Sequence, residues 1–142
     1  MITIKTLSVN HIDKIVELTK QLNPDKSLEL IKERQIDMFT FDNHTCFGCY
    51  LKDELVGVIS GWITVRLYSG KQLEIDNVII DHTKQSMGLG NEAMIQIEQW
   101  AKNNNCLSIE LNTYVHNSRS HKFYFNQGYQ ILGYHFVKKI KP

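Results

Sequence analysis

The sequence predicts a mixed α/β (α+β) domain in which helices cover both faces of a twisted, mixed central sheet. The β-branched run 73–80 is typical of a strand, and it leads through two closely spaced glycines into a long amphipathic helical pattern. Beyond that helix, Leu107, Ile109 and Leu111 alternate with polar residues as a further strand does. A length of 142 residues favours one domain, so we expect a single domain over 1–142.

The remaining elements are expected on both sides of this strand–loop–helix unit. Ser8 is placed to cap a first helix, and Asn23-Pro24 separates it from a second. The order predicted from the N-terminus is strand 2–5, two helices up to about residue 41, a hairpin of strands 45–51 and 55–65, a turn at 68–71, strand 73–80, a helix from Leu89 ending at Asn103-Asn104-Asn105, strand 107–111, a short helix after Asn117, and one or two strands within 129–138.

Composition excludes several classes of function. The content of hydrophobic (42%) and charged (22%) residues is that of an ordinary globular protein, and a net charge of +1 gives no support for binding nucleic acid or membranes. No apolar run approaches the roughly 18 residues of a membrane span, and the start lacks a signal-peptide pattern, so we expect a cytoplasmic protein. A homodimer is compatible with the sequence but not fixed by it.

The three cysteines give no sign of a disulfide framework or a metal site. Cys46 and Cys49 form a Cys-x-x-Cys pair, but they lie in an expected strand, where residues three apart point to opposite faces. No second cysteine pair is present to complete a zinc site. We therefore expect ordinary packing at these positions and no metal cofactor.

Two segments carry the functional signal. In the first, Gln85-Ser86-Met87-Gly88-Leu89-Gly90 joins the strand to the helix, and such a loop can hold a diphosphate on the N–H groups of the first helical turn. A tight turn without a ligand would show the same two glycines. In the second, 117–129, Asn117 can cap a short helix and Gly128 can end it in the left-handed conformation.

Together these segments resemble the GCN5-related N-acetyltransferase (GNAT) superfamily. The loop matches Arg/Gln-x-x-Gly-x-Gly/Ala at Gln85, Gly88 and Gly90. The late helix matches Asn-x-x-Ala-x-x-Phe-Tyr-x-x-x-Gly-Phe/Tyr, with Ser120 where Ala is usual. The order of elements agrees over nearly the whole chain, although its first half has no diagnostic motif.

The resemblance implies that acetyl-CoA binds where the sheet is split between strand 73–80 and the strand after the long helix. The implied cofactor-binding residues are Val78, Ile79 and Ile80 for the pantetheine amides, Gln85, Ser86, Met87, Gly88, Leu89 and Gly90 for the diphosphate, and Asn117 and Tyr124 from the late helix. Many relatives have Arg at the position of Gln85. Glutamine can donate a hydrogen bond but brings no charge, which predicts modest affinity.

The resemblance also implies the catalytic groups. Tyr124 would protonate the departing thiolate, since a phenol with a pKa near 10 is protonated at neutral pH. Glu74 is the first candidate for the base that deprotonates the amine, and Asp76 is the second. The alternatives are a water chain, His116, or a solvated strand face on which Glu74 pairs with Lys71. No residue demands a covalent acetyl-enzyme, because Cys106 has no clear base partner.

The expected activity is acetyl transfer from acetyl-CoA to a primary amine by direct attack in a ternary complex. The amine is left open between small molecules and peptides. Trp62, Tyr50 and Tyr68 either form part of the acceptor pocket or belong to the core, with the core favoured for at least two. The rival interpretation is a catalytically silent acyl-CoA-binding regulatory or interaction module of the same fold. A different diphosphate-binding domain is disfavoured, since the loop lacks the P-loop and dinucleotide spacings.

Overall fold

The computed structural model describes residues 1–141 and divides the chain into two compact units, Met1–Leu111 and a second unit that begins at Asn112. The first unit contains all the strands found in the described residues. They form one five-stranded sheet in the order β1-β2-β3-β4-β5. Neighbouring strands run antiparallel except β4 and β5, which are parallel, so the sheet is mixed as the sequence predicts.

The elements follow the predicted order closely. Their bounds are β1 Ile2–Thr6, a 3-10 turn at Val9–His11, α1 Ile12–Thr19, a 3-10 turn at Lys20–Leu22, α2 Leu28–Phe39, β2 His44–Leu51, β3 Glu54–Arg66, β4 Gly70–Ile80, a 3-10 turn at His82–Lys84, α3 Leu89–Asn103, β5 Ser108–Leu111 and α4 Ser118–Asn126. Ser8 caps the first 3-10 turn and Ser27 caps α2, each by accepting a hydrogen bond from a backbone N–H.

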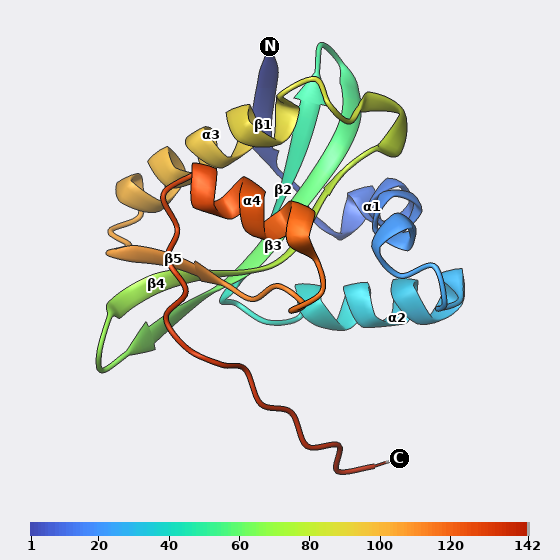
Figure 1. Ribbon diagram of the computed structural model, residues 1–142. Helices are drawn as coiled ribbons and strands as arrows, with labels where there is room; N and C mark the ends of the chain where they lie inside the picture. The colour runs from blue at the N-terminus through green and yellow to red at the C-terminus, as the bar shows by residue number, and fades with distance from the viewer. Residues whose placement is uncertain (142) are drawn as a thin grey trace. The chain divides into compact units, whose positions relative to one another are not determined.

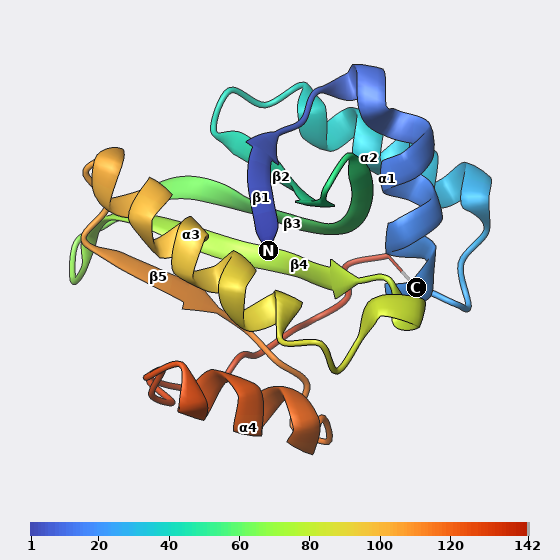
Figure 2. The same ribbon diagram turned by 90° about the horizontal axis from the view of Figure 1, so that it is seen from above.

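Helices pack on both faces of this sheet. In the first unit, α1 and α2 lie on one face and α3 on the other (Figures 1 and 2). Buried apolar residues of α1, among them Ile15 and Leu18, share a cluster with Cys46, Val58 and Ile79 of the sheet. On the other face Phe47 meets Trp100 of α3 edge to face, with ring centroids 4.8 Å apart.

Two irregularities in β3 and β4 shape the first unit. The register between these strands shifts between Ser60 and Gly61, which is a β-bulge. Gly61 is required there, because a Cβ would clash with the carbonyl oxygen of Glu74. In addition, β4 pairs with β5 only from Gln72 to Ile75 but continues to Ile80. The sheet therefore opens between β4 and β5, as expected.

The prediction of strands within 129–138 is wrong. Residues 129–139 have no regular secondary structure, and large apolar side chains of this segment, including Tyr134 and Phe136, are exposed. The segment is rich in aromatic and β-branched residues, as strands are, but a strand exists only when its backbone pairs with another, and no such pairing occurs in the described residues.

Candidate active site

The glycine loop has the backbone of an anion cradle. Ser86 and Gly88 both have positive φ, 65° and 76°, and Gly88 is the N-cap residue of α3. Helix α3 begins at Leu89, so the N–H groups of Leu89 and Gly90 lie in its first turn, where no intrahelical acceptor is available. The positive end of the helix dipole adds to their attraction for a negative group.

Side chains hold this loop in position. The amide nitrogen of Gln85 donates to the carbonyl oxygen of Ile80 across 3.1 Å, which ties the loop back to the end of β4. Asp81 accepts a hydrogen bond from the N–H of Thr83, and Gln21, at the end of the α1 region, accepts one from the N–H of His82 at 3.0 Å. Gln21 was not predicted, because its link to the loop joins residues 61 positions apart.

The backbone of β4 beyond Ile75 is open toward the β5 side. Val78, Ile79 and Ile80 pair on their other side with β3, at Gly57 to Ile59. No strand among residues 1–141 pairs with them on the β5 side. This segment can therefore hydrogen-bond an extended ligand through its main chain.

Glu74 forms an ion pair with Arg66 of β3. Its Oε1 accepts hydrogen bonds from Nη2 and Nε of Arg66 at 2.6 and 3.0 Å, from Thr64 at 3.1 Å and from Gln72 at 2.8 Å. Burial alone would raise the pKa of Glu74, but these donors outweigh it and leave the pKa lowered. A carboxylate that is already paired and weakly basic is poorly suited to deprotonate an amine.

Asp76 has different partners. Its Oδ1 accepts from Ser60 at 2.8 Å and from Asn77 at 3.1 Å, and its Oδ2 accepts from the indole Nε1 of Trp62 at 2.8 Å. All three donors are neutral. Asp76 is exposed, and in the described part of the chain no ion pair involves it. The sequence predicted Asp76 but not its contact with Ser60.

Tyr124 and Asn117 lie in the second unit, on and before α4. Asn117 caps the helix by accepting from the N–H of Ser120 at 3.2 Å, and Gly128 follows with φ 89°, as predicted. The ring of Tyr124 lies between those of Phe123 and Tyr129, at 5.1 and 5.5 Å. Burial raises the pKa of Tyr124, so its phenol is protonated at neutral pH.

The other candidates have ordinary surroundings. Cys46 and Cys49 are buried free thiols, and burial raises the pKa of each to about 12. Burial also raises the pKa of Cys106, which disfavours a thiolate nucleophile. His116 is exposed and stacks on Tyr114 at 5.5 Å. Residues 1–141 contain no group of three or more His, Cys, Asp or Glu side chains that could hold a metal ion.

Tyr50, Trp62 and Tyr68 were expected either in the core or in the acceptor pocket, and none of the three is fully buried. Tyr50 packs against the core cluster of the α1 face, so it is the one that belongs to the core. Tyr68 is exposed and donates to both carboxylate oxygens of Glu110 at 2.7 and 2.6 Å. Trp62 is half-buried, and its indole reaches Asp76. The prediction that two or more are core residues is therefore wrong.

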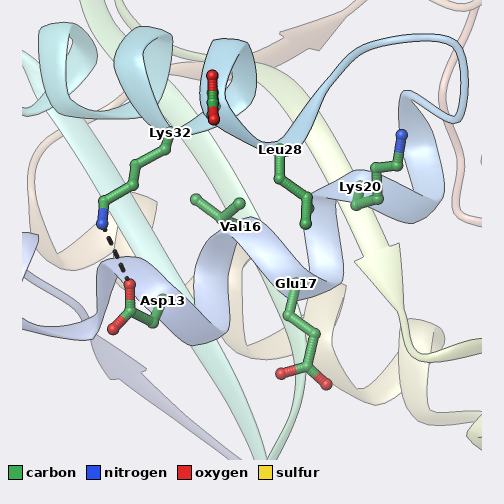
Figure 3. A pocket seen from close by; sticks show the side chains of 7 residues that line it. Asp13, Val16, Glu17, Lys20, Leu28 and Lys32 are labelled. Atoms are coloured by element: carbon green, nitrogen blue, oxygen red, sulfur yellow. Dashed lines mark hydrogen bonds and ion pairs between the residues drawn. The ribbon is translucent and has the colours of Figure 1, made fainter.

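A cavity of about 380 Å³ lies between α1 and α2 (Figure 3). Val16 and Leu28 face each other across it, and the ion pair of Lys32 with Asp13, 3.5 Å long, bridges the two helices. The cavity shares no residue with the glycine loop or the carboxylates of β4. We assign it to helix packing.

Comparisons with known proteins identify the family of the chain. The model of the Acetyltransferase (GNAT) family matches residues 12–129, which is most of the chain. The chain belongs to this family. As a member, it shares its fold with solved structures over nearly its whole length.

Two of these structures illustrate the likeness. Aminoglycoside N-acetyltransferase AAC(6')-Iy, solved in complex with CoA, is 16% identical with a TM-score of 0.84, covering 99% of this chain and 96% of that one. Ribosomal-protein-alanine N-acetyltransferase from Brucella melitensis is 12% identical with a TM-score of 0.81, covering 99% and 100%. At such identities the likeness establishes the fold alone.

A curated relative gives a closer sequence match over part of its length. Streptothricin acetyltransferase from Escherichia coli is 25% identical over 105 residues, which cover 71% of this chain. The match spans 56% of that relative's length.

As for membranes, none of the helices formed by residues 1–141 is both long and apolar enough to cross one.

Proposed function

We propose that the protein is an acetyl-CoA-dependent N-acetyltransferase that transfers the acetyl group directly to a primary amine. The observation that carries the proposal is that the edge of β4, which has no strand partner on the β5 side beyond Ile75, leads through the turn at 81–84 to the N–H groups of Leu89 and Gly90 at the start of α3. When bound, acetyl-CoA supplies the thioester that donates the acetyl group. Its amides and diphosphate are the polar groups that this strand edge and this helix start can bind.

Each predicted residue has a role in this proposal. Val78, Ile79 and Ile80 orient the pantetheine arm, together with Asn117. The loop from Gln85 to Gly90 binds the diphosphate through Gln85, Ser86, Met87, Gly88, Leu89 and Gly90. Tyr124 holds the proton for the leaving thiolate. Of the two carboxylates, Asp76 is better placed than Glu74 to take, directly or through water, the proton that the ammonium loses before its nitrogen attacks the thioester, because Arg66 already neutralises Glu74.

The acceptor is an amine, and its identity is the finer part of the proposal. By their names, the relatives given above act on aminoglycosides, on streptothricin and on an alanine of a ribosomal protein, so both small molecules and proteins are compatible with the family. A cytoplasmic location belongs to the same proposal, since acetyl-CoA is made inside cells. The rival is a silent acyl-CoA-binding module, which would bind the cofactor without turnover.

Thermal unfolding with and without saturating acetyl-CoA tests the proposal, with NADH and ATP as controls that also carry diphosphates. At about 100 times its Kd, a ligand of the native state stabilises it by roughly 2.7 kcal/mol, which raises Tm by several degrees. A shift with acetyl-CoA alone, followed by amine-dependent release of free thiol, supports the transferase. A shift without release from any amine supports the silent module, and no shift contradicts both.

A further inference from the structure

One surface of the first unit combines an exposed aromatic ring, a half-buried one and a carboxylate that forms no ion pair within residues 1–141. We call it the ammonium platform and define it as Phe41, Trp62 and Asp76. Phe41 and Trp62 meet edge to face with centroids 5.7 Å apart, and Trp62 donates to Asp76 at 2.8 Å. Phe41 remains 57% exposed. The exposed ring of Phe41 and the exposed carboxylate of Asp76 are thus joined through Trp62.

The platform is fixed by its surroundings. The segment that carries Phe41 is held on β3, because the N–H of Ile63 donates to the carbonyl oxygen of Asn43 at 2.8 Å and the Asn43 side chain donates to the Ile63 carbonyl oxygen at 3.2 Å. His44 packs against Trp62 at 4.8 Å and supports the indole ring. Ser60, which is 1% exposed, anchors the carboxylate of Asp76. The geometry is therefore formed before any ligand binds.

The contrast between Asp76 and Glu74 indicates the ligand. These two residues lie two positions apart on β4. Asp76 accepts a hydrogen bond from Trp62 and Glu74 accepts one from Thr64, and both donors lie on one face of β3. Glu74 has Arg66 as its cation, whereas Asp76 has only neutral donors. A negative charge beside aromatic rings attracts a cation through both the charge and the ring faces.

The position of Asp76 indicates which cation. It is the first residue of β4 after the last pair with β5, so it lies where the sheet begins to open. We propose that the ammonium platform binds the acceptor as a protonated primary amine, with the ammonium at Asp76 and the adjoining carbon chain against Trp62 and Phe41. This inference rests on the proposed function. It restricts the acceptors to amines that are cationic at neutral pH and carry an aliphatic or sugar skeleton beside the ammonium.

The indole N–H resonance of Trp62 in a ¹H–¹⁵N NMR spectrum tests the platform without turnover. The chain has two tryptophans, so the Trp100→Phe variant assigns the signal. The probes are 1,3-diaminopropane and 1,3-propanediol, which share a skeleton and differ in charge, at matched ionic strength. We expect the diamine to shift the Trp62 signal and the diol to leave it in place. Equal shifts with both would overturn the proposal.

Three variants show which residues contribute to diamine binding. Asp76→Asn keeps the shape but removes the charge, and we expect roughly ten-fold weaker diamine binding. Phe41→Ala leaves the reporter intact and should weaken binding about two- to five-fold. Asp53→Asn, the same change in the exposed β2–β3 turn, should have no effect. Wild-type affinity in both Asp76→Asn and Phe41→Ala contradicts the platform.

The same samples separate this inference from the proposed function. Acetyl-CoA should perturb the amide signals of Gly88 and Gly90 whether or not a diamine is present. Diamine binding at Trp62 with no response to acetyl-CoA would contradict the proposed transferase activity and support the ammonium platform. A response to acetyl-CoA with no diamine binding at Trp62 would contradict the ammonium platform and support the proposed transferase activity.

Discussion

At the scale of single residues, Tyr124 is the group whose chemistry is most specific. Its phenol is protonated at neutral pH, and replacement by Phe removes the hydroxyl while keeping the ring that packs on Phe123 and Tyr129. We expect Tyr124→Phe to lower kcat about 10²-fold or more, the usual contribution of a general acid. Its Kd for acetyl-CoA, measured by thermal shift, should change little.

The matched control for that change is Tyr134→Phe, which makes the same replacement at an exposed position in the C-terminal segment. Its kcat should equal that of the unmodified protein. If Tyr124→Phe kept full kcat, a water molecule or another group would deliver the proton, and Tyr124 would be a packing residue.

Glu74 is a residue whose charge stabilises the fold more than it serves catalysis. Because its pKa is lowered in the folded protein, it stabilises the fold above its unfolded pKa of about 4.3, and this contribution is lost as the pH falls through the folded pKa. In urea unfolding, Glu74→Gln should therefore be less stable than the unmodified protein at pH 7. The difference should shrink between about pH 5 and 3.

That difference should be small even at pH 7, since Arg66 and Glu74 are partly exposed and water screens the pair. Glu33→Gln, on the exposed side of α2, provides the control and should be as stable as the unmodified protein at pH 7. A gap between Glu74→Gln and the unmodified protein that widened in acid would contradict the lowered pKa.

At the scale of elements, the turn from β4 into α3 depends on the left-handed conformation of Gly88. A Cβ there would meet no atom within 4 Å, so the penalty for Ala comes from the backbone alone, about 1–2 kcal/mol. For a chain of this size, we expect Gly88→Ala to lower Tm by about 3–7 °C. It should also weaken acetyl-CoA binding, because the N–H groups of the first turn would reorient.

Gly133→Ala is the matched control, since Gly133 has no positive φ and a Cβ added there would likewise meet no atom within 4 Å. Its Tm should not fall. Equal Tm values for Gly88→Ala and Gly133→Ala would show that the loop relaxes without cost and that its conformation is not fixed before the ligand binds.

The elements also show how far sequence reasoning reaches. The cap at Asn117 and the left-handed Gly128 were predictable because both are local, and so was the helix start beside Gly88. Counting pairs back from the turn at 67–69 places Glu74 opposite Trp62 and not opposite Arg66, so the ion pair of Arg66 with Glu74 depends on how far the arginine side chain reaches along the sheet. The bulge between Ser60 and Gly61 could not be predicted, since it depends on how two strands fit together, and it is what brings Ser60 to Asp76.

At the scale of the whole molecule, a net charge of +1 provides no long-range attraction for a cationic acceptor. Attraction must then come from nearby carboxylates, and Asp76 is exposed to salt. With acetyl-CoA kept saturating, raising the ionic strength from about 0.02 to 0.3 M should raise KM for a diamine roughly three- to ten-fold, with kcat little changed.

The source of this salt dependence can be assigned. In Asp76→Asn the KM should start higher and rise less with salt, whereas in Asp53→Asn it should follow the unmodified protein. An equally steep dependence in Asp76→Asn would mean that the attraction comes from charges spread over the surface. Because the net charge is so close to zero, that result would point to an acidic patch away from β4 and would place the acceptor somewhere other than the ammonium platform.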